Sequence, residues 1–323
     1  MKSLIRNIPK VELHCHLDGS VSKEYLKWQS LLQNIEIDLK KVEVKSDNKS
    51  LEEYLQCFDE ILKVMQTTSS IENAVIDVAK QAIKDGIVYI ELRFAPLFHI
   101  KKGLDVVEVL AAFCKGADYV EKRFDITVRG IICGMKHHSL TDNMHLFKYL
   151  KEKEEYNNYI VGVDLAGAEE KFPIEIHSKA IQYAKSLGLN ITLHAGECNC
   201  IKNIYDSISL GAKRIGHGVA SFNDDNLLKL LSREKIMLEI CPKSNLQTKA
   251  IQDIRELDLS KLLLMNVPFI INTDNRTVTN TTLVEEYKLL LDNDLITIEE
   301  IELINKKAID YVFDDEKRFI KLM

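Results

Sequence analysis

Two histidines stand one residue apart in VELHCHL, residues 11–17, a segment that otherwise has the composition of a buried strand. Because strand side chains alternate between two faces, His14 and His16 point to the same side and Cys15 to the other. A lone buried histidine is usually explained by one hydrogen-bonding partner, whereas two on one face each need their own. Neutral imidazole is the commonest metal ligand, so this spacing favours a shared ion.

Further groups of this kind fall at the ends of other predicted strands. His194 and Glu197 lie in HAGE, His217 lies between glycines in GHG, and Asp274 lies in NTDN. Polar residues at the carboxyl ends of several barrel strands are typical of a catalytic site. Three histidines and one carboxylate suit Zn²⁺ with an open position for water. We therefore predict one zinc ion per chain, held by His14, His16, His194 and Asp274.

The remaining polar groups suggest how such a site would act. A zinc ion lowers the pKa of bound water from about 15.7 to about 7 and so provides hydroxide at neutral pH. Glu197 is placed to act as a general acid or base, and His217 to orient or deprotonate the water. We expect the other five histidines to be solvated, with His137 at the lip of the pocket; these are His99, His137, His138, His145 and His177.

The elements that must position these residues follow a regular rhythm. Short β-branched runs alternate with amphipathic helical patterns such as 178–188 and 224–235, which indicates parallel strands joined by βαβ crossovers. Eight runs favour a (β/α)₈ barrel over an open doubly wound sheet, and no glycine-rich phosphate loop follows the first. We predict a single catalytic domain over 1–323. Its strands would be 11–17, 87–94, 126–133, 160–167, 191–197, 214–220, 236–242 and 268–274.

The first crossover is much longer than the others, since about 70 residues separate the first two predicted strands. We expect a helical insertion over about 20–85 that forms a lid above the carboxyl-terminal mouth of the barrel. One of its helices begins at SLEE, with Ser50 as N-cap. Leu51, Tyr54 and Phe58 share one face of that helix. They either pack the lid onto the barrel or form an apolar rim over a substrate pocket.

The overall composition excludes several other classes of protein. The chain has 323 residues, 46% of them hydrophobic, and a formal net charge of -6, which argues against a nucleic-acid binder. It has no apolar leader and no run long enough to cross a membrane, so we expect a cytoplasmic protein with no membrane partner. The seven scattered cysteines are interpreted as reduced thiols.

Six motifs in one order give the chain a family resemblance. They are VELHCHLDGS (11–20), DLAGAE (164–169), HAGE (194–197), GHG (216–218), CPKSN (241–245) and NTDN (272–275). The chain resembles the adenosine deaminase family, metal-dependent barrels of the amidohydrolase kind. The resemblance spans nearly the whole chain. It implies zinc-dependent hydrolysis of adenosine and 2′-deoxyadenosine to the inosine product and ammonia, with a small purine nucleoside as partner.

The resemblance also implies roles for single residues. Glu197 matches the acid that protonates purine N1, and His217 the residue that orients and deprotonates the water. Asp274 would be both metal ligand and proton acceptor. Gly167 matches the backbone donor to purine N3, and Asp18 the group on the 5′ side of the ribose. The implied zinc ligands are His14, His16, His194 and Asp274, and the predicted substrate contacts are His16, Asp18, Leu51, Tyr54, Phe58, Gly167 and Asn275.

One position departs from the commonest family pattern, which ends the last strand with two aspartates. Here the second is Asn275, whose amide can donate to purine N7 without being protonated first. For a phosphate-bearing substrate, Lys136 and His137 are the nearby basic candidates. The alternatives that stay open are a deaminase of adenine or another 6-aminopurine, a different amidohydrolase, and a barrel kept as a binding module. The oligomeric state is left open by the sequence.

Overall fold

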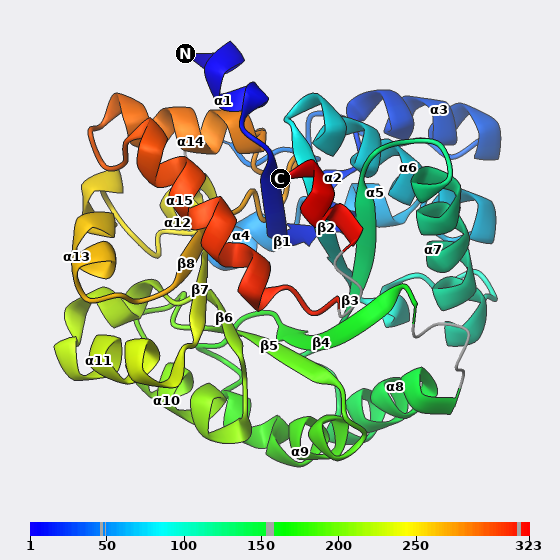
Figure 1. Cartoon of the computed structure of the whole chain (residues 1–323). Helices are drawn as coiled ribbons and strands as arrows, with labels where there is room; N and C mark the ends of the chain where they lie inside the picture. The colour runs from blue at the N-terminus through cyan, green and yellow to red at the C-terminus, as the bar shows by residue number, and fades with distance from the viewer. Residues whose placement is uncertain (46–47, 49, 153–157, 315–317) are drawn as a thin grey trace.

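The computed structural model describes residues 1–45, 48, 50–152, 158–314 and 318–323. Eight parallel strands pair in chain order and form the barrel at the centre of Figure 1. Hydrogen-bonded neighbours run from the first strand to the eighth. The strands are β1 (Lys10–His16), β2 (Ile87–Phe94), β3 (Thr127–Met135), β4 (Ile160–Ala166), β5 (Asn190–Ala195), β6 (Arg214–His217), β7 (Met237–Ile240) and β8 (Phe269–Ile271).

Backbone contacts between the first strand and the segment after the eighth close the barrel. The His16 amide donates to the Asp274 carbonyl over 2.6 Å, and the Asp274 amide donates to the His14 carbonyl over 3.0 Å. The Asn272 side-chain oxygen accepts from the Leu13 and His14 amides as well. The predicted (β/α)₈ barrel is therefore confirmed. Its closure places His14, His16 and Asp274 at one point of the rim.

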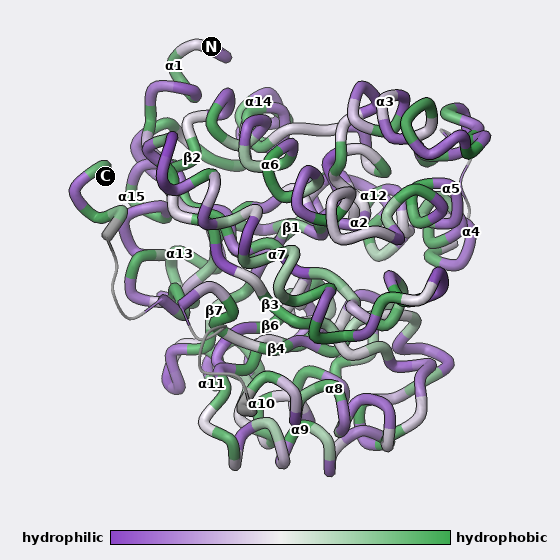
Figure 2. Tube along the Cα trace, turned by 90° about the vertical axis from the view of Figure 1, so that its right-hand side faces the viewer, coloured by the Kyte–Doolittle hydropathy of each residue, from purple (hydrophilic) through white to green (hydrophobic). Residues whose placement is uncertain are grey.

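An outer ring of amphipathic helices covers the strands, and their turns alternate between hydrophobic and hydrophilic residues along the tube in Figure 2. The predicted helical patterns at 178–188 and 224–235 are confirmed as α9 and α11. The ring contains α6 (Thr68–Lys84), α7 (Val106–Glu121), α8 (Leu140–Glu152), α9 (Ser178–Ser186), α10 (Ile201–Leu210), α11 (Asp225–Glu234), α13 (Leu259–Leu264), α14 (Leu283–Asp292) and α15 (Ile298–Ala308).

The connection from β1 to β2 is helical and docks on the carboxyl-terminal end of the barrel. It holds α2 (Leu17–Ser20), α3 (Lys23–Gln33), α4 (Leu51–Leu55) and α5 (Phe58–Leu62), and it runs on into α6. As expected, the Ser50 hydroxyl caps α4 by accepting from the Glu53 amide over 3.2 Å. The Val44 amide donates to the Val278 carbonyl beyond β8.

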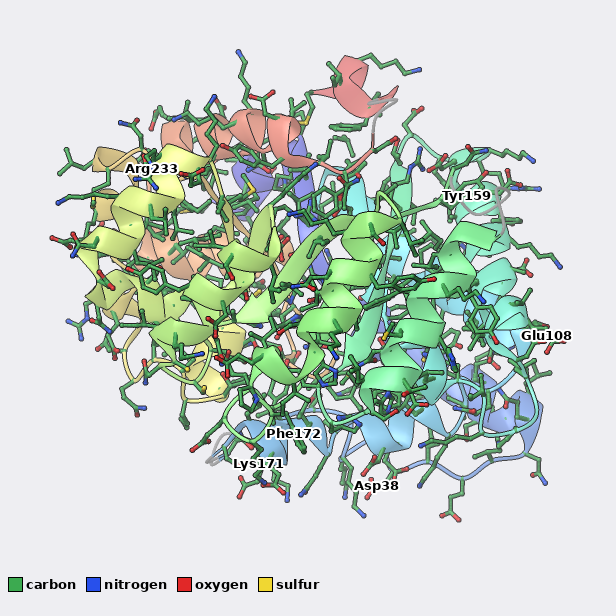
Figure 3. The ribbon with its side chains drawn as sticks, turned by 90° about the horizontal axis from the view of Figure 1, so that it is seen from below. Asp38, Glu108, Tyr159, Lys171, Phe172 and Arg233 are labelled. Atoms are coloured by element: carbon green, nitrogen blue, oxygen red, sulfur yellow. The ribbon has the colours of Figure 1, made fainter. Side chains whose placement is uncertain are left out.

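A second contact ties this insertion to the loop after β4. Lys171 lies 2.7 Å from the Glu52 carboxylate of α4, and Figure 3 places Lys171 and Phe172 beside the insertion. Both partners are exposed, so the pair contributes little stability. The ion pair matters for its position, because it connects the insertion to the loop after β4 at the mouth of the barrel.

Two strands end three residues earlier than their sequences predict. The patterns at 214–220 and 268–274 suggest long strands, but β6 ends at His217 and β8 at Ile271. His217 and Asp274 have φ values of 63° and 62°, in the left-handed region that non-glycine residues rarely adopt. The backbone departs from regular strand geometry at these two residues, although Asp274 still pairs with β1, and both side chains reach the cluster at the barrel mouth.

Buried ion pairs fill the barrel interior beneath this rim. Arg93 of β2 lies 2.8 Å from both Asp164 and Glu239, and Arg214 of β6 pairs with Glu239 and Glu91. All five side chains are fully buried. Buried charges are retained at low cost only when they are paired and hydrogen-bonded, as they are here. This network lies directly under the histidine cluster.

Two expectations from composition are also tested by the described residues. All seven cysteines are free, and five of them are buried, so the reduced-thiol interpretation is confirmed. None of the helices in the described ranges is long and apolar enough to cross a membrane.

Candidate active site

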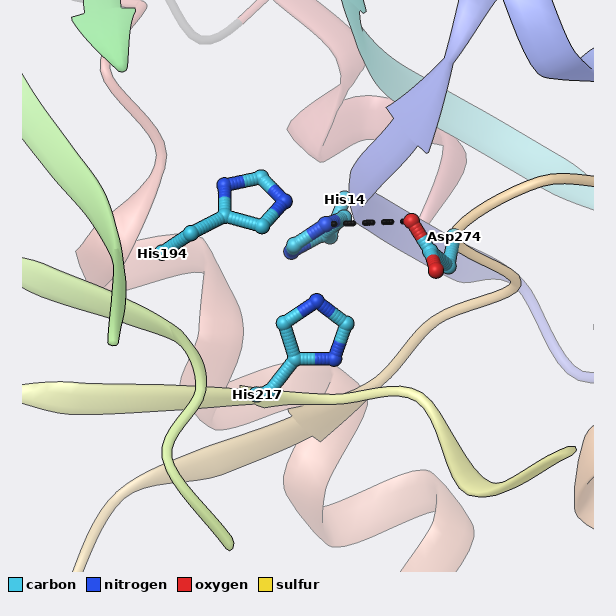
Figure 4. A group of neighbouring side chains, drawn as sticks. All are labelled: His14, His194, His217 and Asp274. Atoms are coloured by element: carbon cyan, nitrogen blue, oxygen red, sulfur yellow. Dashed lines mark ion pairs between the residues drawn. The ribbon is translucent and has the colours of Figure 1, made fainter. Parts of the chain in front are cut away.

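Four histidines and one aspartate converge at the carboxyl-terminal end of the barrel. One ligand atom each from His14, His194, His217 and Asp274 lies within 4.8 Å of the others (Figure 4). The His14 Nε2 atom is 3.4 Å from Asp274 Oδ1. His16 joins them, since its Nε2 atom is 3.2 Å from His194 Nε2 and 3.4 Å from Asp274 Oδ1. The predicted ligand set is thus brought together, with His217 beside it.

Buried carboxylates orient two of these histidines from behind. The His14 Nδ1 atom is 3.0 Å from Glu239, and the His194 Nδ1 atom is 2.7 Å from Asp164. Although burial opposes it, the charge of Arg93 helps to hold the pKa of Glu239 below its ordinary value, so this group is a carboxylate. A carboxylate on Nδ1 keeps the proton there and turns a bare Nε2 toward the centre, which is how metal-binding histidines are held.

The cluster fits a divalent metal on its own chemistry. His14 Nε2 is buried and makes no well-formed hydrogen bond with the residues that the structure describes, although Asp274 Oδ1 lies 3.4 Å away. An unpaired buried nitrogen costs free energy unless something binds it. Three imidazoles and one carboxylate form a donor set of intermediate softness, which suits Zn²⁺.

His217 is held differently from the other histidines. Its Nδ1 atom is hydrogen-bonded to the Asn245 side-chain amide over 3.0 Å, and its Nε2 atom is 3.8 Å from Glu197 Oε2. Burial lowers the pKa of His217 well below its ordinary value, so the ring is neutral. A neutral imidazole that faces both an acid and the other residues of the His/Asp cluster is suited to proton transfer.

Glu197 extends from the turn that follows β5. Gly196 has a φ of 74° there, and the Gly196 and Cys198 amides donate to Glu169 over 3.0 and 2.8 Å. Burial, together with the charges of Asp274 and Glu169, raises the pKa of Glu197 to about 8. Glu197 therefore holds a proton at neutral pH.

These groups form the floor of a cavity of about 310 Å³. The insertion provides one wall, and the ends of β3 and β4 provide the opposite one, where Gly167 has a φ of 106°. His14 lies beneath the cavity rather than on its surface. Every other predicted site residue lines it, namely His16, Asp18, Leu51, Tyr54, Phe58, Gly167, His194, Glu197, His217, Asp274 and Asn275.

Asp18 reaches the cavity from α2. Its Oδ2 atom accepts from the Ala95 amide over 3.3 Å and lies 3.4 Å from His99 Nε2. Its Oδ1 atom is buried without a partner among the described residues. Although burial opposes it, the hydrogen bond from His99 lowers the pKa of Asp18, so the group is a carboxylate with a free acceptor.

The expectation that the five other histidines are solvated is wrong for two of them. His99 is fully buried, with Nδ1 2.8 Å from the Met65 carbonyl and Nε2 facing Asp18. His177 is also buried, with Nε2 2.8 Å from the Lys136 carbonyl. Each ring links a loop to a helix through its two nitrogens, His99 the Met65 loop to α2 and His177 the loop after β3 to α8. Local sequence does not reveal this role. His137 and His145 are exposed, and His137 lines the cavity mouth.

Lys136 also differs from its expected place as a basic group open to a phosphate. It is 2% exposed, and its ammonium donates to the His194 carbonyl over 2.8 Å. The side chain is therefore committed to holding the end of β5. Glu169 was likewise not singled out from the sequence, although it lies within the DLAGAE motif.

A larger groove of about 1210 Å³ lies at the opposite end of the barrel, beside α15 and the amino-terminal ends of β5 to β8. It contains none of the histidines or carboxylates of the cluster. Cavity volume alone therefore does not identify the candidate active site, because the histidines and carboxylates line the smaller cavity.

Comparisons with known proteins agree on one family. A family model described as "Adenosine deaminase" matches residues 9–323. A protein named adenosine deaminase from Enterococcus faecalis is 37% identical over 99% of this chain and 96% of its own length.

Solved structures show the same fold. An adenine deaminase from Arthrobacter aurescens, 20% identical, superposes with a TM-score of 0.88 over 97% of this chain and 96% of its own. An N6-methyl-AMP deaminase from Arabidopsis thaliana, 27% identical, gives 0.87 over 100% and 97%.

Proposed function

The chain belongs to the adenosine deaminase family and is a hydrolytic deaminase; we propose that its substrate is adenosine, or 2′-deoxyadenosine, and its cofactor one zinc ion. The observation that carries the proposal is the placing of Glu197 and His217 in one cavity with the His/Asp cluster. Water adds to C6 of the purine, and ammonia leaves to give the inosine product.

The proposed zinc ligands are His14, His16, His194 and Asp274. Support comes from the orientation of His14 and His194 by carboxylates on Nδ1 and from the orphan Nε2 atom of His14. A bound Zn²⁺ would lower the pKa of a water molecule and so supply a nucleophile at neutral pH.

Protein groups would carry the protons of the reaction. Glu197, with its raised pKa, would donate a proton to purine N1 and make C6 electrophilic. His217, held neutral by burial, would accept the proton of the attacking water. Asp274 would accept a second hydrogen bond from that water. On the rest of the ring, the Gly167 amide would donate to N3, and the Asn275 amide to N7.

Asp18 supports a nucleoside over a nucleotide. Its buried carboxylate presents one free oxygen from the cavity wall, which suits a ribose hydroxyl on the 5′ side. A phosphate in the same place would meet an anion, and Lys136 is already committed to the His194 carbonyl.

We therefore expect kcat/KM for adenosine to exceed that for AMP or adenine by at least about 100-fold, measured by the change in ultraviolet absorbance on deamination. Asp18→Asn is expected to lower kcat/KM for adenosine and leave the slow reaction of adenine unchanged, since adenine has no ribose. A preference of the wild type for AMP or adenine would overturn the substrate assignment and leave the deaminase assignment standing.

A further inference from the structure

The Tyr54 hydroxyl has no role in the chemistry proposed above. The predicted single helical face is divided in the structure, because α4 ends at Leu55 and Phe58 begins α5. Leu51 and Phe58 both still line the cavity and offer it only carbon, as an apolar rim would. The Tyr54 side chain is 2% exposed and extends beyond them to the loop after β8. There its oxygen lies 2.7 Å from Thr279 Oγ1 and 2.8 Å from Asn275 Nδ2. Buried tyrosines need one polar partner, and this one has several from a single loop.

The contact fixes which way the Asn275 amide points. One Nδ2 hydrogen is donated to the Tyr54 oxygen, which leaves the second hydrogen for another acceptor. The Asn275 oxygen is buried without a partner in the described ranges and packs against Gly19 of α2. A Cβ atom on Gly19 would lie only 1.9 Å from that oxygen, so no larger residue fits without moving the amide.

The same hydroxyl touches the metal-site carboxylate. It lies 3.5 Å from Asp274 Oδ2, an atom that also accepts a hydrogen bond of 2.5 Å from Ser244. With Asn275 donating to the Tyr54 oxygen, the tyrosine proton is directed to Thr279 or to Asp274. A single side chain of the insertion thereby contacts both residues at the end of NTDN.

We propose that Tyr54 is a positioning residue that selects for an acceptor at purine position 7. With α4 packed on the barrel, the Tyr54 hydroxyl holds Asn275 so that an N–H, and not the amide oxygen, faces the purine ring. This inference rests on the proposed function. Without that hydroxyl no described residue hydrogen-bonds the amide, so its oxygen and nitrogen can exchange places, and the oxygen opposes the N7 lone pair in half of its orientations. The packing of the insertion against the loop after β8 thereby affects how the purine base is recognised.

The test compares two ligands that cannot be deaminated, inosine and 7-deazainosine, whose rings differ at position 7. Calorimetry gives the ratio of their dissociation constants, which measures the position-7 contact. We expect wild-type protein to prefer inosine by about three- to tenfold, the range of one neutral hydrogen bond. Tyr54→Phe, which removes the hydroxyl alone, should lower the ratio by about twofold or more, since only half of the amide orientations then present an N–H. Metal content should stay at the wild-type value.

Tyr25→Phe is the matched control. Tyr25 of α3 is also buried, and its hydroxyl donates to the Ser70 carbonyl over 2.7 Å, remote from the cavity. This variant should keep the wild-type ratio even if it is less stable. An unchanged ratio in folded Tyr54→Phe, or a wild-type ratio of one, would overturn the inference alone. Wild-type protein that binds neither ligand and leaves adenosine intact would overturn the proposed function as well.

Discussion

Three of the four histidines in the cluster are distinguished by the residues that lie behind them. His14 and His194 are backed by carboxylates, whereas His217 is backed by the Asn245 amide. This difference separates rings that present a bare nitrogen to a metal from a ring suited to proton transfer. Glu197 completes the set, and at neutral pH burial leaves it protonated.

Substitution of Glu197 tests the proposed proton donor. Glu197→Gln keeps the shape of the side chain and removes the transferable proton, so kcat for adenosine should fall by about 100- to 10,000-fold. Metal content and the melting temperature should stay near wild type. Glu234→Gln, on an exposed residue of α11, serves as the control and should be fully active. Wild-type kcat in Glu197→Gln would remove this residue from the mechanism.

At the scale of single residues, the sequence predicted the groups that face the cavity better than those behind them. HxH, HAGE and NTDN are short motifs, so spacing and strand position were enough to find their members. Glu239 and Asp164 lie within apolar strands and act through contacts between distant segments. Nothing local to either residue indicates which histidine it orients.

At the scale of the elements, the sequence patterns overestimated the lengths of β6 and β8 at their carboxyl ends. The predicted strands 214–220 and 268–274 continue beyond the last residues of β6 and β8. Left-handed backbone at His217 ends β6, and the same conformation at Asp274 interrupts the continuation after β8; outside glycine it has no reliable sequence signature. Departures from regular structure thus coincide with the site itself.

A buried acid on α14 gives the fold a pH dependence that is separate from catalysis. Glu286 accepts from the Thr281 hydroxyl over 2.6 Å and from the Lys243 amide over 3.0 Å. Burial outweighs these bonds and raises its pKa from 4.5 to about 7. The folded state therefore binds more protons than the unfolded state, so the free energy of unfolding falls as pH rises from about 4.5 through 7.

Glu286→Gln should remove this loss, because the glutamine oxygen can still accept from the Lys243 amide while its NH₂ group donates to the Thr281 hydroxyl oxygen. We expect the variant to exceed wild type in unfolding free energy at pH 8 by about 1–3 kcal/mol. At pH 4.5 the two should be nearly equal. Urea denaturation at the two pH values measures the difference. Glu285→Gln, its half-exposed neighbour, is the control, and a similar gain in that variant would assign the effect to general surface charge instead.

For the molecule as a whole, the alternation of strands and helices was sufficient to predict the barrel, since eight βαβ units have few ways to pack. The insertion was harder. Its length and the Ser50 cap were visible in sequence, but its docking through Val44 and Tyr54 depends on contacts with segments more than 200 residues away. Whether it opens as a lid remains a prediction of the sequence pattern.

One zinc ion at the His/Asp cluster should be required for deamination. Metal-free protein, prepared with a chelator that is then removed, is titrated with Zn²⁺ while adenosine turnover is followed by absorbance. We expect no turnover without metal, and a linear rise in the turnover rate that ends at one equivalent of Zn²⁺ per chain. Full activity in the metal-free protein, or a rise that continues to two equivalents, would contradict it.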